Sequence, residues 1–579
     1  MEEKELIMAE AKDNRNLKLK SWIQFTVIVA AIIVIASAFK ALRLRLDLTE
    51  DKRFTLSTPT HNILKGLTND IFIQVYLDGE MPIPFKKLKR SVQEMLEEFR
   101  IASGRHIDYE FINPADAKNA QEREEQYTAL YHKGLNPIDI QAGDVEGGKS
   151  QKRIFPGMLI NYNKVEVPLN FLKNNQSLLP EQNILHSMES LEYEMIQTIA
   201  TITSDTIYKV AFLEGQGELQ DIEVGDITYN LSRFFTIDRG SINGKTGILN
   251  NYAAVIVAKP IKEFNEPDKL VLDQYIMNGG KVLWLVEEVD VNSDSLINGE
   301  TVGLYHPVNI EDMLFRYGAR INPEIIQDIA DFMVLRLSVT TGAESKQIVP
   351  VPWFYYPLLN PNQNHPVTKN LNKVKGEFVN TIDTVGLDPA IKKTILLSTS
   401  SYSRTLSPPL VIRLKEAELT PDEKDFNKSG LSAALLLEGV FPSAFKNRMI
   451  NNMVNDPGFK LKTSSKETKM IVVADGDIIR NEVSRMGNKA IPSILGQDKY
   501  TGQIYGNRDF IINCMNYLVD NNGLMELRSR EIKLRLLDKQ RIKTERLKWQ
   551  LINITLPLFI VILAGIIYGF IRKRIYTKC

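Results

Sequence analysis

Cysteine and histidine are scarce in this chain of 579 residues, which contains two cysteines and six histidines. Cys514 lies in the apolar run FIINCMNYL, which predicts a buried helix, and Cys579 is the last residue. We expect the two thiols to lie in different compartments and not to pair, which excludes a disulfide framework. The histidines are scattered, and no pair has zincin or zinc-finger spacing.

An excess of charge of one sign is also missing. Lys and Arg total 71, as do Asp and Glu, so the formal net charge is +0 at pH 7. This balance gives no support for nucleic acid as a partner. No G-x-S-x-G nucleophile elbow is present, and Cys514 does not lie at a strand-to-helix turn. We therefore predict a protein that is not an enzyme and has no cofactor. A triad assembled in space leaves no such spacing, so an enzyme stays an alternative.

Two long apolar runs lie near the ends of the chain. Residues 549–571 read WQLINITLPLFIVILAGIIYGFI, and about 20 apolar residues span the ~30 Å core of a bilayer. Residues 22–39 form a second run, and we favour an uncleaved anchor over a cleavable signal peptide because its apolar core is long. Basic residues flank both ends of each run, so the positive-inside rule assigns no orientation.

The two runs divide the chain into segments. If both span a membrane, the termini share one side and the residues between the spans lie on the other. The predicted segments are a cytoplasmic tail (1–21), a transmembrane helix (22–39), a small α/β domain (40–180), a main α/β region of two subdomains (181–525), a basic juxtamembrane helix (526–548), a transmembrane helix (549–571) and a cytoplasmic tail (572–579).

Between the runs, near-continuous apolar strands alternate with helical patterns. This alternation predicts an α/β fold with doubly wound parallel-sheet domains of Rossmann or flavodoxin-like type, in a large extracytoplasmic region between two transmembrane helices. Residues 181–204 predict one long helix. Residues 310–328 continue the helical pattern, and residues 347–367, rich in proline and aromatics, predict an ordered irregular connection or lid.

One motif match is misleading. Residues 143–150, GDVEGGKS, fit the phosphate-loop pattern G-x4-G-K-[ST]. That loop works only where it leads into a helix whose amides face the phosphates. Pro156 and Gly157 follow soon after, with strand-like residues beyond. We therefore predict a polar hairpin loop between IDIQ and MLINYN rather than a nucleotide site.

Two groups of residues at strand ends are candidates for binding. Ligands of parallel sheets bind beyond the carboxyl ends of strands, which makes Gly215, Gln216, Gly217 and Glu218 the candidate ligand loop, although glycine pairs at strand ends are commonly turns. Asp475 and Asp477 follow another strand and could hold a metal ion. Acidic residues there more often cap a following helix, here expected at Ile478–Arg485.

Seven separated strings resemble one known family. The likeness extends over most of the chain in the same linear order. The strings are LDLTEDKRFTLS (46–57), FLEGQGEL (212–219), LDQYIMNGGKVLWLVEEV (272–289), NIEDMLFRYG (309–318), LLLEGVFPSAFKNR (435–448), GNRDFIINCMNYL (506–518) and LRSREIKLRLLDK (527–539). Together they resemble the gliding-motility-associated ABC transporter auxiliary proteins, the GldG family, of Bacteroidetes-type bacteria.

The resemblance implies an inner-membrane protein with a large periplasmic α/β region, whose relatives are often labelled substrate-binding. It implies a separate ATPase subunit and an ABC permease subunit as partners, besides membrane lipid. We expect a non-enzymatic auxiliary subunit in gliding motility and possibly linked secretion, with Arg535, Lys539 and Arg546 of the juxtamembrane helix as candidate partner contacts. The alternatives are a membrane-tethered periplasmic enzyme of amidotransferase-like or hydrolase-like fold, or a periplasmic sugar- or peptide-binding module.

Overall fold

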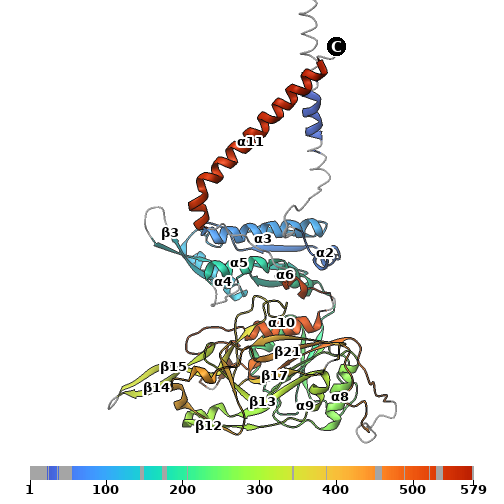
Figure 1. Ribbon diagram of the computed structural model, residues 1–579, viewed down its shortest axis with the longest axis vertical. Helices are drawn as coiled ribbons and strands as arrows, with labels where there is room; N and C mark the ends of the chain where they lie inside the picture. Colours follow the sequence, from blue (N-terminus) through green and yellow to red (C-terminus); the bar gives the residue numbers. More distant parts are fainter. Residues whose placement is uncertain are drawn as a thin grey trace, which may run out of the picture. The chain divides into compact units, whose positions relative to one another are not determined.

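The structure is a computed structural model (Figure 1) that divides into two compact units, Met1–Ser57 and Thr58–Cys579. It describes residues 22–23, 25–34, 37, 55–143, 149–172, 179–204, 206–341, 345–386, 388–449, 459–487, 489–520, 522–529 and 539–576. In the first unit, the described residues form an apolar helix over Phe25–Val34, which is shorter than a span requires. The predicted span over 22–39 is therefore not confirmed.

The second unit begins with a four-stranded sheet in the order β2-β1-β5-β6. The strand β1, the helix α3 and the strand β2 follow one another, as in the predicted small α/β domain, and β1 pairs with β2 in parallel. Ile71, Ile73 and Val75 alternate along β1 and are buried, which matches the two-residue period of a strand. The elements are α2 (Thr58–Lys65), β1 (Ile71–Val75), α3 (Ile83–Ala102), β2 (Ile107–Phe111), α4 (Ala120–His132), β5 (Gly157–Tyr162) and β6 (Val165–Asn170).

The phosphate-loop match lies in a hairpin. β3 (Ile138–Gly143) pairs antiparallel with β4 (Lys149–Ile154), so the chain after Lys149 is a strand and not a helix. A phosphate loop requires that helix, and the predicted hairpin is confirmed. The expected second strand was wrong, because MLINYN forms β5 and pairs with β1 and β6 instead.

The predicted long helix over 181–204 is interrupted. The chain forms α5 (Pro180–Glu189) and α6 (Leu191–Thr203), which meet at Ser190. The amide of Ser190 donates a hydrogen bond to the carbonyl of His186 at the C-terminal end of α5.

The central sheet is mixed rather than parallel throughout. Its strand order is β14-β15-β18-β21-β22-β10-β9-β7-β8. The five strands from β22 to β8 pair in parallel, whereas β21, β18, β15 and β14 add antiparallel neighbours. The predicted doubly wound parallel arrangement is therefore not confirmed. The strands are β7 (Lys209–Leu213), β8 (Thr236–Gly240), β9 (Ala254–Ala258), β10 (Val282–Leu285), β14 (Phe332–Thr341), β15 (Ser345–Pro361), β18 (Ile391–Ser398), β21 (Ser432–Gly439) and β22 (Thr468–Val473).

Apolar side chains are buried on both faces of this sheet. One core cluster joins the sheet to α7 (Gly225–Leu231) and α10 (Asn507–Val519). A second joins it to α8 (Glu266–Met277) and α9 (Glu311–Tyr317). Cys514 lies in α10 and is fully buried, as predicted, and burial raises the pKa of its thiol. A protonated buried thiol is inert, which fits a packing role for this residue.

Residues 310–328 are helical only in their first half. α9 ends at Gly318, whose φ of 113° closes the helix in the left-handed conformation that glycine adopts readily. The chain continues as β13 (Ala319–Asp328), so the prediction of a continuous helix was wrong. β13 pairs with β17 (Asn380–Thr384) and β19 (Ser403–Leu406).

The proline-rich segment 347–367 is mainly a strand, which corrects the predicted irregular connection or lid. β15 continues to Pro361 and forms a long antiparallel hairpin with β14 (Figure 1). Pro350 and Pro352 stand two residues apart, so both point the same way across the hairpin. Proline has no N–H to donate, but on the side of β15 away from β14 no ladder hydrogen bond is required at these two positions. Proline is tolerated at such a strand edge. Trp353 and Tyr355 of the same strand are buried in a separate small core.

The remaining elements are short. They are β11 (Val289–Val291), β12 (Glu300–Tyr305), β16 (Val374–Lys375), β20 (Leu410–Arg413), β23 (Val483–Met486), β24 (Lys489–Pro492) and the 3-10 helices η1 (Ser293–Asn298), η2 (Leu414–Glu418), η3 (Glu423–Asp425), η4 (Gly476–Ile479) and η5 (Met525–Ser529).

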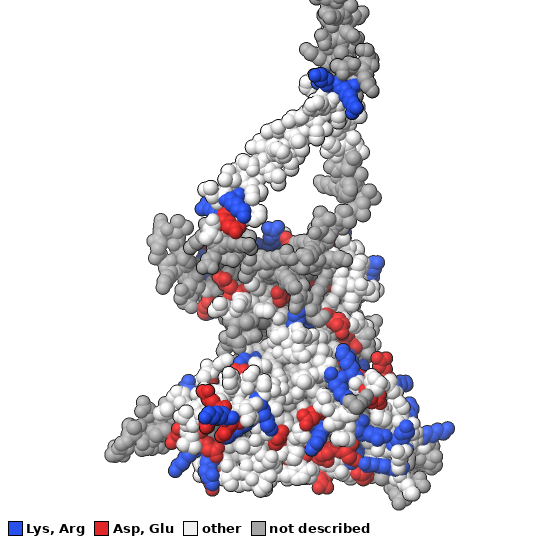
Figure 2. Space-filling view, in the orientation of Figure 1, with Lys and Arg blue, Asp and Glu red and all other residues white. Residues whose placement is uncertain are grey.

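The tail ends in the long helix α11 (Lys539–Tyr576). Its stretch Thr544–Arg574 is 31 residues long and apolar enough to cross a membrane. Figure 2 shows charged side chains at the two ends of this stretch and none along its middle. Within the juxtamembrane helix expected over 526–548, the described residues 526–529 belong to η5 and those from Lys539 on belong to α11. Residues 530–538 lie outside the described part of the chain.

η5 packs onto the core through its side chains. Arg528 donates to Asn513 Oδ1 and, at 3.0 Å, to the carbonyl of Lys369, and its guanidinium lies 5.4 Å from the centre of the Tyr193 ring. Met525 is 1% exposed and accepts a hydrogen bond from Tyr193 Oη. The segment that precedes α11 is therefore a packed part of the α/β region.

The burial of His365 should make the stability of the core depend on pH. It is buried, its Nδ1 accepts from the amide of Val367, and burial lowers its pKa to about 4. A lowered folded-state pKa contributes stability that is present above the unfolded value of about 6.5 and is lost as pH falls towards 4. We expect the melting temperature of wild type to fall more steeply over this range than that of His365→Gln, by thermal unfolding. Parallel pH profiles would contradict this assignment.

Candidate functional site

The carboxyl ends of four parallel strands meet at one edge of the central sheet. In the spatial order β8-β7-β9-β10-β22, the chain adds β8 on one side of β7 and β9 on the other, so the strand order reverses between β7 and β9. Ligands of α/β sheets bind beside such a switch point. β7 leads into the loop Glu214–Ile222, which we name the β7 loop. β9 leads to Lys259, β10 to Glu287, and β22 to Asp475 and Asp477.

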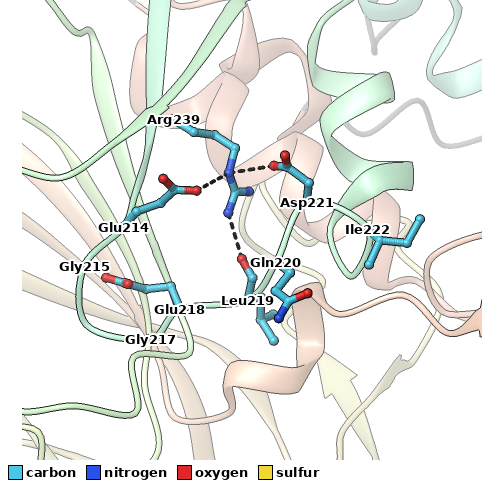
Figure 3. Close-up of a pocket in the computed structure, with 9 residues that line it drawn as sticks. All are labelled: Glu214, Gly215, Gly217, Glu218, Leu219, Gln220, Asp221, Ile222 and Arg239. Atoms are coloured by element: carbon cyan, nitrogen blue, oxygen red, sulfur yellow. Dashed lines mark hydrogen bonds and ion pairs between the residues drawn. The ribbon is translucent and has the colours of Figure 1, made fainter.

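The β7 loop folds around the guanidinium of Arg239, which comes from β8 (Figure 3). Gly215 and Gly217 have φ values of 122° and 77°, so both positions favour glycine. The loop borders a pocket of about 490 Å³. Its lining residues are Glu214, Gly215, Gly217, Glu218, Leu219, Gln220, Asp221, Ile222 and Arg239.

Arg239 holds the β7 loop in place. Its Nε lies 2.8 Å from Glu214 Oε1 and 2.7 Å from Asp221 Oδ1, and its Nη2 donates to the carbonyl of Leu219 at 2.8 Å. The guanidinium also lies over the ring of Phe212, 5.4 Å from its centre. Sequence reasoning missed Arg239, because it belongs to no motif. Its only signal is a charged residue inside a short strand next to the candidate loop.

Of the candidate loop residues, Gly215, Gly217 and Glu218 line this pocket and Gln216 does not. Gln216 is buried, and its Nε2 donates to Asp268 Oδ2 at 3.2 Å. Glu218 Oε2 accepts from the amide of Gln216 at 2.8 Å, and burial raises the pKa of Glu218. Among the described residues, Gln216 Oε1, Glu218 Oε1 and Arg239 Nη1 are buried without a hydrogen-bond partner. Ligand binding here stays a prediction.

Asp475 and Asp477 join Glu287, with one oxygen of each within 4.8 Å of the others. Lys259 Nζ lies 2.5 Å from Asp477 Oδ2 and 3.2 Å from Glu287 Oε2, where a cation would bridge them. Lys259 therefore occupies the position of a bridging cation, which favours internal ion pairs at this group, and a metal ion held by Asp475 and Asp477 stays a prediction. Asp475 also accepts from the amide of Asp477 and caps η4. The expected helix at Ile478–Arg485 is wrong, because this 3-10 turn ends at Ile479.

Further charges complete this ion cluster. Arg480 Nε lies 3.0 Å from Asp477 Oδ1, although no directed hydrogen bond forms there. Arg480 and Lys375 both pair with Glu377, at 3.3 Å and 2.7 Å. Burial raises the pKa of Glu377, but Lys375 and Arg480 outweigh it and lower that pKa to about 2. The full cluster comprises Lys259, Glu287, Lys375, Glu377, Asp475, Asp477 and Arg480.

Burial of the ion cluster raises the pKa values of two of its carboxyl groups. Burial and the neighbouring carboxylates raise the pKa of Asp475, whereas burial raises the pKa of Glu287 against the opposing effect of Lys259. Lys259 itself adopts a left-handed backbone with φ of 53°, which a non-glycine residue rarely does. The cluster ties the chain after β9, β10 and β22 to β16, at the edge that carries the β7 loop.

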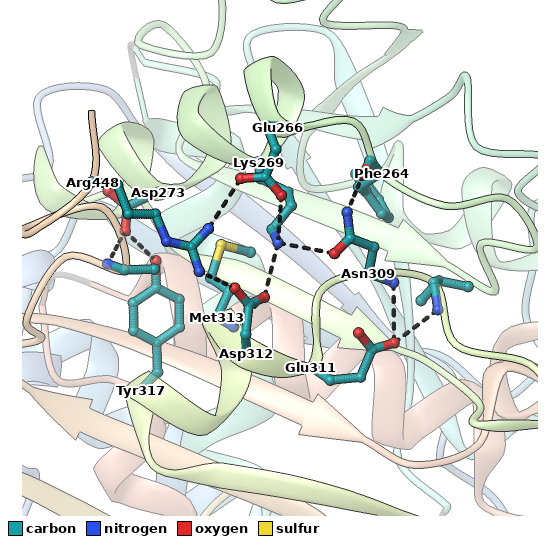
Figure 4. A network of polar contacts seen from close by, with 12 residues as sticks. Phe264, Glu266, Lys269, Asp273, Asn309, Glu311, Asp312, Met313, Tyr317 and Arg448 are labelled. Carbon is teal, nitrogen blue, oxygen red and sulfur yellow. Dashed lines mark hydrogen bonds and ion pairs between the residues drawn. The ribbon is translucent and has the colours of Figure 1, made fainter. Parts of the chain in front are cut away.

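A second polar network joins α8, α9 and the chain after β21 (Figure 4). Lys269 is 1% exposed, and its Nζ lies 2.9 Å from Asp312 Oδ1 and 3.1 Å from Glu266 Oε1. Arg448 pairs with the same two carboxylates.

Within this α8–α9 network, Asp273 accepts from Tyr317 Oη, Ser443 Oγ and the amide of Ala444, each at 2.7 Å. Each donor lies on a different part of the chain from Asp273. All of its bonds are internal, which indicates a packing role.

Of the three predicted partner contacts, Lys539 and Arg546 belong to α11. Arg535 lies outside the described residues, and so does the side chain of Lys539. Arg546 is exposed on α11. These residues stay predictions.

Comparison with known proteins finds a family match over the region that contains this edge of the sheet. A sequence profile described as an ABC-type uncharacterized transport system (ABC_transp_aux) matches residues 208–514, and a domain of unknown function (DUF7088) matches residues 50–161. An "Uncharacterized protein" of Borreliella burgdorferi is 21% identical over 419 residues, covering 70% of this chain and 75% of that protein. A solved structure, "mmIFT52 N-terminal domain", has a TM-score of 0.30 and 14% identity, covering 54% of this chain and 98% of its own.

The first profile covers more than half of the chain, from the residue before β7 to within α10. The β7 loop, the ion cluster and the α8–α9 network all lie inside the matched residues. The chain therefore belongs to the ABC-type uncharacterized transport system family, as an auxiliary component.

Proposed function

We propose that the protein is a non-enzymatic, membrane-anchored auxiliary subunit of an ABC-type transporter complex that serves bacterial gliding motility and linked protein secretion. The family match over 208–514 carries the transporter role and implies transporter components as partners. We assign two partners, an ABC permease and a separate ATPase. The β7-loop pocket recognises a partner or cargo of that complex.

Support for the membrane anchor comes from α11. A helix of 31 residues reaches about 46 Å at 1.5 Å per residue, which exceeds the ~30 Å hydrocarbon core. Trp549 and Tyr568 lie towards opposite ends of the apolar run, where interfacial aromatics are common. We place the anchor in the inner membrane and the α/β region in the periplasm, as the GldG-family resemblance implies.

Two observations support a role without catalysis. The residues that line the β7-loop pocket include no serine, cysteine or histidine, so the Ser- or Cys-nucleophile chemistry of an amidotransferase-like or hydrolase-like enzyme has no nucleophile among them. The phosphate-loop match is a hairpin, which leaves the ATPase site to another subunit. The motility assignment itself rests on the seven strings that resemble the GldG family.

Co-purification tests the proposal. The full chain, extracted from its native membrane in mild detergent, should bring down one ABC permease and one ATPase, identified by mass spectrometry. Recovery of the chain alone under conditions that preserve other membrane complexes would contradict it. Deletion of the gene should abolish gliding while leaving growth intact.

The juxtamembrane cations provide a sharper test. Replacing Arg535, Lys539 and Arg546 with alanine should weaken permease recovery several-fold while membrane insertion is unchanged, because basic contacts beside the span would be lost. The matched control replaces three exposed lysines of the α/β region, Lys262, Lys415 and Lys424. Equal loss of the permease in both triple variants would argue against a specific contact.

A further inference from the structure

Two amide side chains near the start of the apolar run of α11 have unmet hydrogen-bonding capacity. Gln550 and Asn553 have no side-chain hydrogen bond to any described residue. Thr555 differs, because its Oγ1 donates to the carbonyl of Leu551 at 2.8 Å and is therefore satisfied within its own helix. The described part of the chain buries none of the most apolar window of this helix. The two amides must therefore find their partners outside it.

Pro557 leaves a third group unmatched at the same place. α11 continues through this proline, which has no backbone N–H. In an α-helix that N–H would bond to the carbonyl four residues earlier, so the carbonyl of Asn553 lacks its usual donor. Membrane helices tolerate proline because neighbouring groups, including those of other helices, satisfy the freed carbonyl. Asn553 thus presents an unmatched carbonyl together with an unmatched amide.

These groups lie inside the hydrocarbon region once α11 spans a bilayer. Trp549 is of the type that marks the membrane interface, and Asn553 follows four residues later, about 6 Å deeper at 1.5 Å per residue. Long basic side chains reach back to the interface from such a depth, whereas the short side chain of asparagine does not. Lipid tails offer no hydrogen bonds, so another helix is the favoured partner.

The two amides belong to one face of α11, which we name the α11 face. Its members follow one another at intervals of three or four residues, which places them on the same side of a helix. They are Gln550, Asn553, Pro557, Val561, Ala564 and Tyr568. Thr555, whose hydroxyl is already bonded, belongs to the opposite side. Ala564 is small, which lets a second helix approach closely at that level.

We propose that the α11 face binds the same face of a second copy of this chain, with the two spans parallel and the Asn553 amides paired across the dimer axis. Both copies insert in the same direction, so each places its Asn553 at the same depth. The amide supplies donors from Nδ2 and an acceptor at Oδ1, and the freed carbonyl accepts a further N–H. A face that both donates and accepts is complementary to itself, as a two-fold contact requires. The inference rests on the membrane anchor proposed above and goes beyond the transporter role.

Disulfide crosslinking in native membranes tests the geometry on the full chain. The background variant is Cys579→Ser, which leaves Cys514 fully buried and inert. Copper phenanthroline should link Ala564→Cys, on the α11 face, into a dimer. Leu563→Cys is the matched control at nearly the same depth on the other side of the helix, and it should stay monomeric. Equal linking of both variants, or linking of neither, would overturn the proposal. Linking of Ala564→Cys to a different protein would assign the face to that protein and also overturn it.

Two further variants test the amide itself. Asn553→Leu should raise the dissociation constant of the dimer about 3- to 30-fold, the equivalent of one hydrogen bond between membrane helices. Thr555→Val removes a hydroxyl that is bonded within its own helix and should leave the constant unchanged. Sedimentation equilibrium of the full chain at graded detergent concentrations measures both. Equal constants for the two variants would show that Asn553 does not contribute to the contact.

Pro557→Ala separates the contact from the integrity of the helix. The substitution restores the missing N–H, satisfies the carbonyl of Asn553 within α11 and makes the helix more regular. It should nevertheless weaken the dimer about threefold, the low end of the range for such a hydrogen bond. An unchanged or tighter dimer would contradict the role of the freed carbonyl. A dimer without recovery of transporter subunits would overturn the proposed function alone, and subunit recovery with a monomeric chain would overturn this inference alone.

Discussion

Replacing Asp273 with alanine should destabilise the large α/β region by about 3–5 kcal/mol, the range for breaking a buried charged pair or network. Asp273 is fully buried and accepts hydrogen bonds from Tyr317, Ser443 and Ala444. The substitution leaves these donors unpaired in the interior, where each unsatisfied group costs about 1–3 kcal/mol. Denaturant unfolding followed by tryptophan fluorescence measures the change.

The matched control for that variant is Asp290→Ala, at an exposed aspartate on β11. It should change stability by less than about 0.5 kcal/mol, because surface substitutions away from special features do little. Tyr317→Phe removes one of the donors and should have an intermediate effect. Equal midpoints for Asp273→Ala and Asp290→Ala would show that the α8–α9 network does not stabilise the fold.

Replacing Lys259 with methionine should have an effect of similar size, about 3–5 kcal/mol near neutral pH. The ammonium lies between Glu287 and Asp477, and its loss leaves these carboxylates and Asp475 close together without it. Arg480 still pairs with Asp477, whereas among the described residues Lys259 is the cation that forms an ion pair with Glu287. Lys262→Met, at an exposed lysine three residues on, is the matched control.

The pH dependence of Lys259→Met separates electrostatics from packing. Without the ammonium, the folded-state pKa values of Glu287 and Asp475, already raised in the wild-type protein, rise further above their unfolded values of about 4. Stability from a raised pKa is present at low pH and is lost as pH rises. The difference in melting temperature from wild type should therefore be larger at pH 8 than at pH 5. A constant difference would assign the effect to packing.

The sequence predicted the elements at the candidate edge better than their arrangement. The predicted alternation of apolar strands with helices matches the strands β7, β9, β10 and β22 and the helix α8, and the apolar run around Cys514 predicted α10. The parallel order of the first four strands followed from their alternation with helices. The antiparallel half could not be predicted, because buried strands such as β18 and β21 have the same apolar character in either direction.

The side-chain contacts of the site could not be predicted from the sequence either. Lys259 and Asp477 are 218 residues apart and meet only because β9 and β22 lie on either side of β10. Arg239 reaches the β7 loop because β8 pairs beside β7. Such contacts depend on strand order, which no local pattern contains. β15 shows the converse case, since its prolines suggested an irregular connection but occupy an edge that tolerates them.

Several of the strings that resemble the GldG family contribute residues that pack together in the fold. Asp273, Tyr317 and Ser443 come from three different strings and meet in the α8–α9 network. The string at 527–539 includes Arg528, which packs against Tyr193. Much of the resemblance therefore reports on packing of the core, whereas the string at 212–219 includes most of the β7 loop.

The packing of η5 onto the core limits how far the α/β region can move from its anchor. Only residues 530–538 separate Ser529 from Lys539, and about ten chain steps reach at most ~35 Å. With α11 in a bilayer, as we propose, the β7 loop searches a small volume next to the membrane, where a tethered partner has an effective concentration in the millimolar range. A contact too weak to survive dilution can then be occupied most of the time. Soluble fragments that lack α11 should consequently bind far more weakly than the tethered chain.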